Sequence, residues 1–286
     1  MNSHTEATTA SEQATFWNED GGRRWAAHSD ATDARLAPLS DHLLARIGAR
    51  PGERILDIGC GTGTTSAALS AAVAPGGRVT ALDVSRVILD VAIQRHTGTP
   101  NLEFLLADAG THAFAPDGFD VLASRLGVMF FHDPPTAFTN LRRALGPGGR
   151  LCFLCWRRLD ENPWMGLAAR AAFTVLPKPP RPAPGTPGPF AFADTQRVSD
   201  ILATAGFVDV GFEAVDRPVD LGSLEQAMAW LTSMGPAAGP LREADDANRA
   251  RAEAAMRDAL GAAMTDGRVV LAGAAWVVTA KRPLAG

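Results

Sequence analysis

The segment best suited to chemistry in this chain of 286 residues is a glycine-rich turn. Residues 55–65 (ILDIGCGTGTT) are typical of an apolar strand, a tight turn and the start of a helix. Gly59, Gly61 and Gly63 allow the backbone to turn sharply and to approach a ligand closely, as a nucleotide-binding turn requires. The dinucleotide pattern G-x-G-x-x-G needs a third glycine where the chain has Thr64. The turn therefore indicates a nucleotide-like ligand and argues against NAD or FAD.

Two aspartates stand at the ends of the next two expected strands. Asp83 ends the strand expected at 78–84, twenty residues after Gly63, and Asp108 follows the strand expected at 102–107. Because the carboxyl ends of parallel strands meet at one edge of a sheet, both carboxylates should lie beside the glycine turn. Asp83 can accept hydrogen bonds from two ribose hydroxyls, and Asp108 can accept one from an adenine amino group. These strand ends together predict a nucleoside pocket.

The elements that must position this pocket alternate between strand and helix. This alternation predicts an α/β fold with a doubly wound, mostly parallel sheet and right-handed crossovers. A helix expected over 16–47 carries an apolar stripe that needs such a sheet to pack on. The stripe consists of Leu36, Leu39, Leu43 and Ile47. The expected strands are 53–59, 78–84, 102–107, 119–124, 150–156 and a closing strand at 269–280.

The alternation ends after Trp156. Seven prolines within 177–189 predict a long, stiff loop, because proline is excluded from helix interiors and central strands. Residues 1–15 carry almost no large apolar side chain and are expected to form a flexible tail, which leaves 16–286 as one domain. The further elements expected are a helix at 194–205 with Asp194 as its N-cap, a strand at 207–215, and helices at 223–235 and 241–264.

Composition excludes several classes of protein. Hydrophobic residues make up 46% of the chain and charged residues 20%, as in ordinary globular proteins, and a net charge of −4 disfavours a nucleic-acid partner. No stretch approaches 18 consecutive apolar residues, so no membrane span is expected. An odd number of cysteines and a polar start to the chain favour the cytoplasm. Cys152 and Cys155 should point to opposite faces of a strand, so neither a metal site nor a disulfide is expected there.

The motifs over residues 50–156 resemble those of class I S-adenosylmethionine-dependent methyltransferases, in which D-I-G-C-G-T-G (57–63) is a specific signature. The resemblance implies a seven-stranded, Rossmann-like methyltransferase sheet whose last strand is antiparallel and inserted by a hairpin beside the fifth. Residues 276–282 look similar to that ending. The implied cofactor is S-adenosylmethionine, with S-adenosylhomocysteine as product and no metal.

The resemblance also implies roles for individual residues. The glycines would approach the methionine part of the cofactor, as would the main chain at Ser124 and Arg125. Asp57 would lie beneath the cofactor's amino group, Asp83 would bind the ribose and Asp108 the adenine. The expected cofactor-binding residues are Asp57, Gly59, Cys60, Gly61, Gly63, Asp83, Val84, Asp108, Ala109, Ser124 and Arg125.

The fourth strand end separates this chain from enzymes that methylate nucleobase amines. Those enzymes carry [Asn/Asp]-Pro-Pro-aromatic there, whereas this chain has SRLG at 124–127. Asp133-Pro134-Pro135 comes later and is followed by Thr136, so we interpret Asp133 as a helix N-cap. Further segments resemble a bacterial group of small-molecule methyltransferases similar to the ubiquinone/menaquinone C-methyltransferase type. These segments are 16–18, 23–25, 124–131, Trp156, 162–164 and 188–190.

The substrate should bind beside the carboxyl ends of the strands, where inserted segments leave the sheet. N-terminal helices over 16–50 and insertions at 157–193 and 222–266 are expected to form a lid over the cofactor-binding core at 51–156. Their aromatic residues would suit a small, apolar or aromatic substrate, although each could simply pack the lid. The lid residues considered are Met165, Phe173, Phe192, Trp230 and Met234, with Trp17, Trp25, Trp164 and Phe190 as the expected substrate-binding residues.

A general base is needed only for some acceptors. If the acceptor is a hydroxyl, His132 or His28 could take its proton, although each also reads as an ordinary histidine. Arg125 could steer an acidic group of the substrate or form a structural ion pair.

The sequence thus predicts an enzyme that transfers a methyl group from S-adenosylmethionine to oxygen, nitrogen or carbon of a small organic acceptor. Three alternatives remain at this stage. They are a cyclase or decarboxylase that binds the cofactor without methyl transfer, an NAD-type oxidoreductase, and a binding protein without chemistry. A homodimer also stays open.

Overall fold

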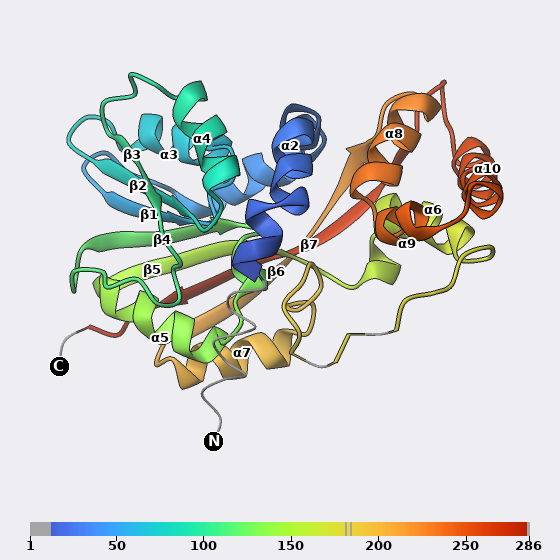
Figure 1. The fold of residues 1–286 in the computed structure, drawn as a ribbon. Helices are drawn as coiled ribbons and strands as arrows, with labels where there is room; N and C mark the ends of the chain where they lie inside the picture. The colour runs from blue at the N-terminus through green and yellow to red at the C-terminus, as the bar shows by residue number, and fades with distance from the viewer. Residues whose placement is uncertain (1–12, 181, 184, 285–286) are drawn as a thin grey trace.

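The computed structural model describes residues 13–180, 182–183 and 185–284, which include one seven-stranded sheet. The strands are β1 (Arg54–Ile58), β2 (Arg78–Asp83), β3 (Leu102–Leu106), β4 (Phe119–Arg125), β5 (Leu145–Trp156), β6 (Val208–Asp220) and β7 (Val270–Lys281). Their order is β3-β2-β1-β4-β5-β7-β6 (Figure 1). Strands β1 to β5 pair in parallel, whereas β7 is antiparallel to both β5 and β6. The predicted α/β fold with an antiparallel last strand is confirmed.

Helices cover both faces of this sheet. The helices are α2 (Asp20–Ile47), α3 (Thr64–Val73), α4 (Arg86–Arg95), α5 (Pro134–Ala144), α6 (Pro163–Ala172), α7 (Thr195–Thr204), α8 (Leu224–Met234), α9 (Ala238–Glu243) and α10 (Asp246–Ala262), with 3₁₀ turns η1 (Val128–Phe130) and η2 (Leu159–Glu161). Helices α2, α3 and α4 lie on one face, and α5 and α7 lie on the other (Figure 1). Helices α6, α8, α9 and α10 gather where β6 ends and β7 begins (Figure 1). Among the described helices, none combines the length and the apolar character that a membrane crossing requires.

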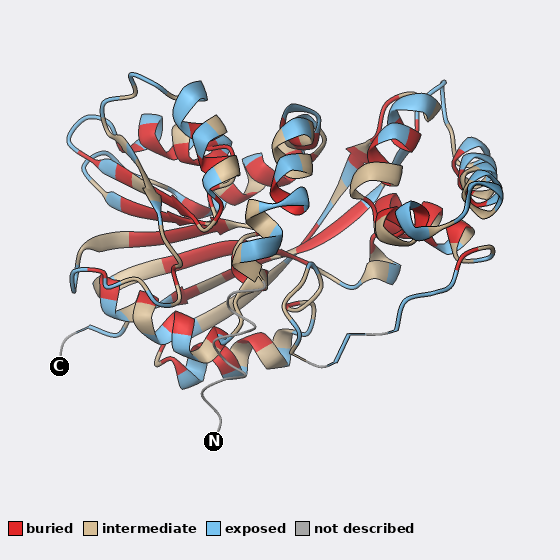
Figure 2. Cartoon of the chain, in the orientation of Figure 1, coloured by how far each residue is buried: buried red, intermediate tan, exposed pale blue. Residues whose placement is uncertain are grey.

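The core lies where the sequence pattern places it. Ile55 and Leu56, neighbours on β1, are both 0% exposed, because a central parallel strand is covered on both faces. The apolar stripe of α2, from Leu36 to Ile47, is buried against the sheet as predicted. Figure 2 shows the buried residues along the central strands and on the helix faces turned toward them.

Some expected boundaries were wrong. The helix expected at 241–264 is two helices, α9 and α10, because Asp245 accepts a hydrogen bond from the Asn248 amide and so begins a new helix. Strand β5 begins at Leu145, before the expected 150. Strand β6 continues to Asp220, beyond the expected 215, because it pairs along its length with β7.

The structure agrees in part with the expectations for the N-terminal segment, the proline-rich segment and the helix caps. Of the expected tail at 1–15, residues 1–12 lie outside the described part of the chain, and 13–15 already belong to a helical turn over 13–18. The described residues of 177–189 form neither helix nor strand, as the prolines predict. Asp133 and Asp194 cap α5 and α7 as expected.

Strand β1 ends beside a buried carboxyl group. The Asp57 side chain is 0% exposed, and its Oδ2 accepts a hydrogen bond of 2.6 Å from Ser66 Oγ of α3. Its Oδ1 is buried and has no partner in the described part of the chain. Burial raises the pKa of Asp57 from 3.8 to about 6, and the Ser66 hydrogen bond opposes this rise.

We expect the free energy of unfolding of the wild-type protein to fall as the pH rises from about 4 to about 7. The fall should exceed that of the Asp57→Asn variant by up to about 3 kcal/mol. The folded carboxyl holds its proton more tightly than the unfolded one. Its contribution to stability is therefore complete below pH 3.8 and is lost as the pH rises through about 6. Urea unfolding at both ends of this range measures the difference. The same pH dependence in both proteins would contradict the burial of an ionisable carboxyl here.

Candidate functional site

A cavity of about 520 Å³ lies at the carboxyl ends of β1 to β4. Its floor consists of those strand ends and the loops that follow them. Its cover consists of residues 13–18, α2, the start of α6, and the segment of α8 and α9 at 230–242. Floor and cover come from segments far apart in the sequence, so the site exists only in the folded chain.

Gly59 and Gly61, two of the three glycines of the turn, have different structural roles. Gly59, Gly61 and Gly63 have φ of 66°, 58° and 84°, which only glycine adopts readily. A Cβ on Gly59 would lie 2.8 Å from the Cα of Gly127. The turn after β1 and the turn after β4 can therefore pack against each other only if residue 59 is glycine. A Cβ on Gly61 would meet only Trp25 Nε1, at 3.5 Å. Gly59 and Gly61 line the cavity, and Gly61 gives a ligand access to the backbone.

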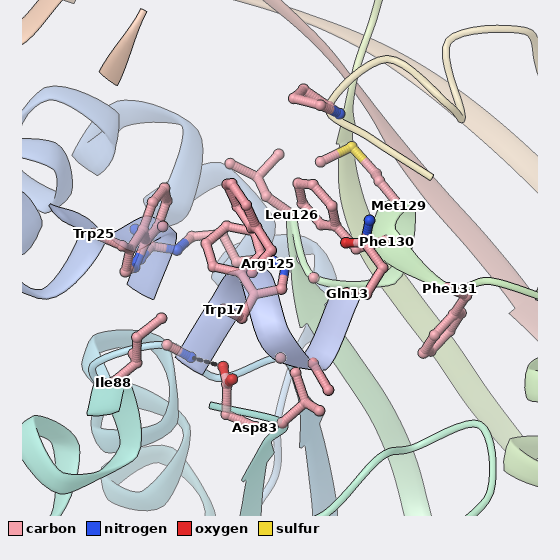
Figure 3. Close-up of a pocket in the computed structure, with 18 of the residues that line it drawn as sticks. Gln13, Trp17, Trp25, Asp83, Ile88, Arg125, Leu126, Met129, Phe130 and Phe131 are labelled. Atoms are coloured by element: carbon pink, nitrogen blue, oxygen red, sulfur yellow. Dashed lines mark hydrogen bonds between the residues drawn. The ribbon is translucent and has the colours of Figure 1, made fainter. Parts of the chain in front are cut away.

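Asp83 joins the turns after β1 and β2. Its Oδ2 accepts a hydrogen bond of 3.0 Å from the Gly61 amide, drawn in Figure 3, and its Oδ1 accepts one of 2.9 Å from the Ser85 amide. The side chain lines the cavity while the residue is only 8% exposed. Burial raises the pKa of Asp83, and the backbone hydrogen bonds oppose the rise. Because a carboxylate has lone pairs beyond these two bonds, it can still accept from a ligand.

The other predicted residues on the floor lie close to Asp83. Val84, Asp108 and Ala109 line the cavity. Asp108 Oδ1 accepts a hydrogen bond of 2.7 Å from the Gly110 amide, which fixes the loop after β3. The structure therefore brings the two strand-end aspartates to one cavity.

Four of the expected cofactor-binding residues do not line the cavity. They are Asp57, Cys60, Gly63 and Ser124. Asp57 and Ser124 are buried behind the floor, where Ser124 Oγ donates to the Ile58 carbonyl at 2.7 Å and accepts from the Gly127 amide at 3.2 Å. Burial raises the pKa of the Cys60 thiol. These residues shape the floor from behind.

Arg125 forms a structural ion pair. Its guanidinium lies 2.5 Å from Asp33 of α2 and donates to Ser40 Oγ at 3.2 Å. Asp33 also accepts a hydrogen bond of 2.6 Å from Thr64, the first residue of α3. The pair therefore fastens α2 to the floor, although Arg125 still lines the cavity.

Aromatic rings from both insertions and the N-terminal segment line the cover. Trp17 packs edge-on against Trp25 and Phe130, at ring-centroid distances of 6.1 and 5.1 Å (Figure 3). The ring centroid of Trp164 lies 5.3 Å from those of both Trp156 and Trp230. Trp17, Trp25 and Trp164 line the cavity, as an acceptor site requires.

The remaining lid residues divide between the cavity and its surroundings. Phe190, also expected to bind substrate, is half-buried and does not line the cavity, whereas its neighbour Pro189 does. Met165, Trp230 and Met234 line it. Phe173 and Phe192 do not.

The two candidate histidines differ in position. His132 lines the cavity between η1 and α5. His28 does not line it, and its Nε2 lies 3.0 Å from Ser233 Oγ, where it links α2 to α8.

Sequence reasoning missed several lining residues. Met129 and Phe130 of η1 face the cavity just after Leu126, whose φ is 66° although it is not glycine. Arg24 and Arg242 line the cavity from its cover. The positions 17, 21, 24, 25, 32 and 36 all face the cavity from the N-terminal helices, and this helical spacing was the available signal for Arg24.

The comparisons with known proteins agree with this geometry. Residues 56–153 match the family model described as a methyltransferase domain. A nocamycin O-methyltransferase of Saccharothrix syringae is 29% identical over 220 residues, which cover 72% of this chain and 78% of that protein. A demethylmenaquinone methyltransferase of Clavibacter sepedonicus is 42% identical over 100 residues, or 35% of this chain and 40% of that protein. The chain thus spans about two fifths of the length of the latter relative.

A solved structure shares the fold over nearly the whole chain. It is phosphoethanolamine N-methyltransferase 2 of Haemonchus contortus in complex with S-adenosyl-L-methionine, with a TM-score of 0.57 and 17% identity. The match covers 95% of this chain and 60% of that one. The sheet order, the glycine turn and the matched domain lead to one assignment: residues 56–153 form a methyltransferase domain of the class I, S-adenosylmethionine-dependent type.

Proposed function

We propose that this protein transfers a methyl group from S-adenosylmethionine to oxygen, nitrogen or carbon of a small, apolar or aromatic organic acceptor. The observation that supports this most is that one cavity has the glycine turn, Asp83 and Asp108 in its floor and tryptophans in its cover. A cavity of this size is in the range of small-molecule sites.

The residues on the floor fit the cofactor. Asp83 is a buried acceptor with free lone pairs for ribose hydroxyls, and Asp108 stands at the next strand end. Gly61 leaves the backbone open to the cavity. The Asp57 Oδ1, which has no partner among the described residues, adds a buried acceptor behind the turn. The carboxyl groups of Asp83, Asp108 and Asp57 suit a ligand that carries positively charged groups, because opposite charges attract.

The chain would assist methyl transfer through position and exclusion of water. S-adenosylmethionine supplies an electrophilic methyl group on a sulfonium. Asp83 would orient the nucleoside part, while Trp17, Trp25 and Trp164 would hold the acceptor and keep water out of the site. Alignment of the reacting atoms in a dry cavity accounts for much of the rate in displacements of this kind.

For a hydroxyl acceptor, His132 is the better placed general base. It lines the cavity, whereas His28 lies outside it beside Ser233. A base must come within hydrogen-bond reach of the proton that it removes.

The names of the relatives support a small organic acceptor. One is a nocamycin O-methyltransferase and another a demethylmenaquinone methyltransferase, so the names of the two relatives refer to different organic compounds. The mainly apolar cover of this chain agrees with such acceptors and not with a nucleic acid.

We expect the purified protein to transfer labelled methyl groups from S-adenosylmethionine to members of a panel of phenols, amines and quinols. One molecule of S-adenosylhomocysteine should form for each methylated product. Mass spectrometry of the product and chromatography of the cofactor measure both quantities.

With a hydroxyl acceptor, His132→Gln should lower kcat by about 10²- to 10⁴-fold, and His28→Gln should change it little.

Two results would contradict the proposed transfer. Conversion of an acceptor while S-adenosylmethionine is recovered intact would indicate a cyclase or decarboxylase. Saturable binding of NAD without binding of S-adenosylhomocysteine would indicate an oxidoreductase.

Asp83→Asn should weaken the binding of S-adenosylhomocysteine by about 10- to 100-fold, because hydrogen bonds to a charged acceptor are lost. Isothermal calorimetry measures the dissociation constant, and near-UV circular dichroism checks that the variant is folded. Asp90→Asn on the exposed side of α4 is the matched control and should bind normally. An unchanged affinity in folded Asp83→Asn would remove the ribose assignment.

A further inference from the structure

The charged groups of the cavity are divided between floor and cover. Its carboxylates, Asp83, Asp108 and Asp133, all belong to the floor, at the ends of β2 and β3 and before α5. Each accepts backbone amide hydrogen bonds there. The floor is therefore the acidic side of the cavity.

The cover is the basic side. Arg24 of α2 and Arg242 of α9 line the cavity from the cover. Within 13–180, 182–183 and 185–284, neither side chain makes an ion pair or a hydrogen bond. Arg125, the third lining arginine, differs because Asp33 neutralises it. Half-buried Arg24 and exposed Arg242 thus line a mainly apolar cover without a carboxylate partner among the described residues.

Asp20, a carboxylate within Coulombic reach of both arginines, is already paired. Asp20, at the start of α2, pairs with Arg23 at 2.9 Å and does not line the cavity. Its pKa is lowered first by the hydrogen bond and charge of Arg23, and further by the charges of Arg24 and Arg242. The two lining arginines therefore lie within Coulombic reach of one carboxylate that Arg23 already holds.

We propose that the methyl acceptor carries a carboxylate, which Arg24 and Arg242 bind at the cover while its apolar body lies against the tryptophans. This inference rests on the proposed function and narrows its substrate class. Guanidinium groups match a carboxylate in geometry and hold it with charge-assisted hydrogen bonds. At half-buried Arg24 such a bond is stronger than in water, because the surroundings screen it less, whereas exposed Arg242 contributes less.

The division of charge also separates the two ligands. The sulfonium and ammonium groups of the cofactor are favoured at the acidic floor, and the carboxylate of the acceptor is favoured at the basic cover. Each would be disfavoured on the other side by like charge. The carboxylate end of the acceptor would then be held at the cover, and its nucleophilic atom would face the floor.

The test uses the whole protein saturated with S-adenosylhomocysteine. Hydroxynaphthoate and the neutral hydroxynaphthamide of the same shape are titrated by calorimetry. We expect the carboxylate to bind at least about tenfold more tightly than the amide. In the double variant Arg24→Gln, Arg242→Gln, the preference should fall to about threefold or less, while the affinity for S-adenosylhomocysteine stays the same.

Arg23→Gln is the matched control, because it removes a neighbouring arginine that does not line the cavity. It should keep the preference for the carboxylate. The inference is overturned if the amide binds as well as the carboxylate, if no carboxylate binds, or if the double variant keeps the full preference. In those cases S-adenosylhomocysteine still binds and the proposed function stands. Failure of S-adenosylhomocysteine to bind the wild-type protein would overturn both.

Discussion

The site depends on one buried carboxylate shared by two turns. Asp83 accepts the amide of Gly61 from the turn after β1 and the amide of Ser85 from the turn after β2. A buried carboxylate without such donors would carry a large desolvation cost, so its hydrogen bonds fix both turns in position. The glycine turn can then keep its left-handed conformations and leave the Gly61 backbone open. The acidic floor of the cavity follows from this arrangement.

The cover is held to the floor by a few polar contacts. Arg125 at the end of β4 pairs with Asp33 of α2, and Asp33 accepts from Thr64 of α3. Trp230 of α8 donates to Thr32 of α2 at 3.1 Å, which brings the second insertion onto the same helix. Helix α2 therefore connects the floor to the lid, and a ligand between them contacts both.

The local parts of this structure could be predicted from the sequence. Apolar runs define the central strands, and the glycine turn with Asp83 and Asp108 indicates where a nucleoside would bind, because each signal lies within a short segment. Parts that depend on packing between distant segments could not be predicted in the same way. The tilted packing of Trp164 against Trp230 joins two separate insertions, and only the folded chain shows that Arg24 and Arg242 line one cavity while Phe190 does not. Gly59, read as a ligand contact, is also required by its packing against Gly127.

A crystal structure of the protein with S-adenosylhomocysteine tests the central claim most directly. The account predicts ribose hydroxyl oxygens about 2.5–3.0 Å from the Asp83 carboxylate and the amino-acid part of the ligand beside Gly61. The cover residues Trp25 and Trp164 should then enclose the remaining space beside the sulfur atom. A ligand bound outside this cavity, or one that makes no contact with Asp83, would contradict the account.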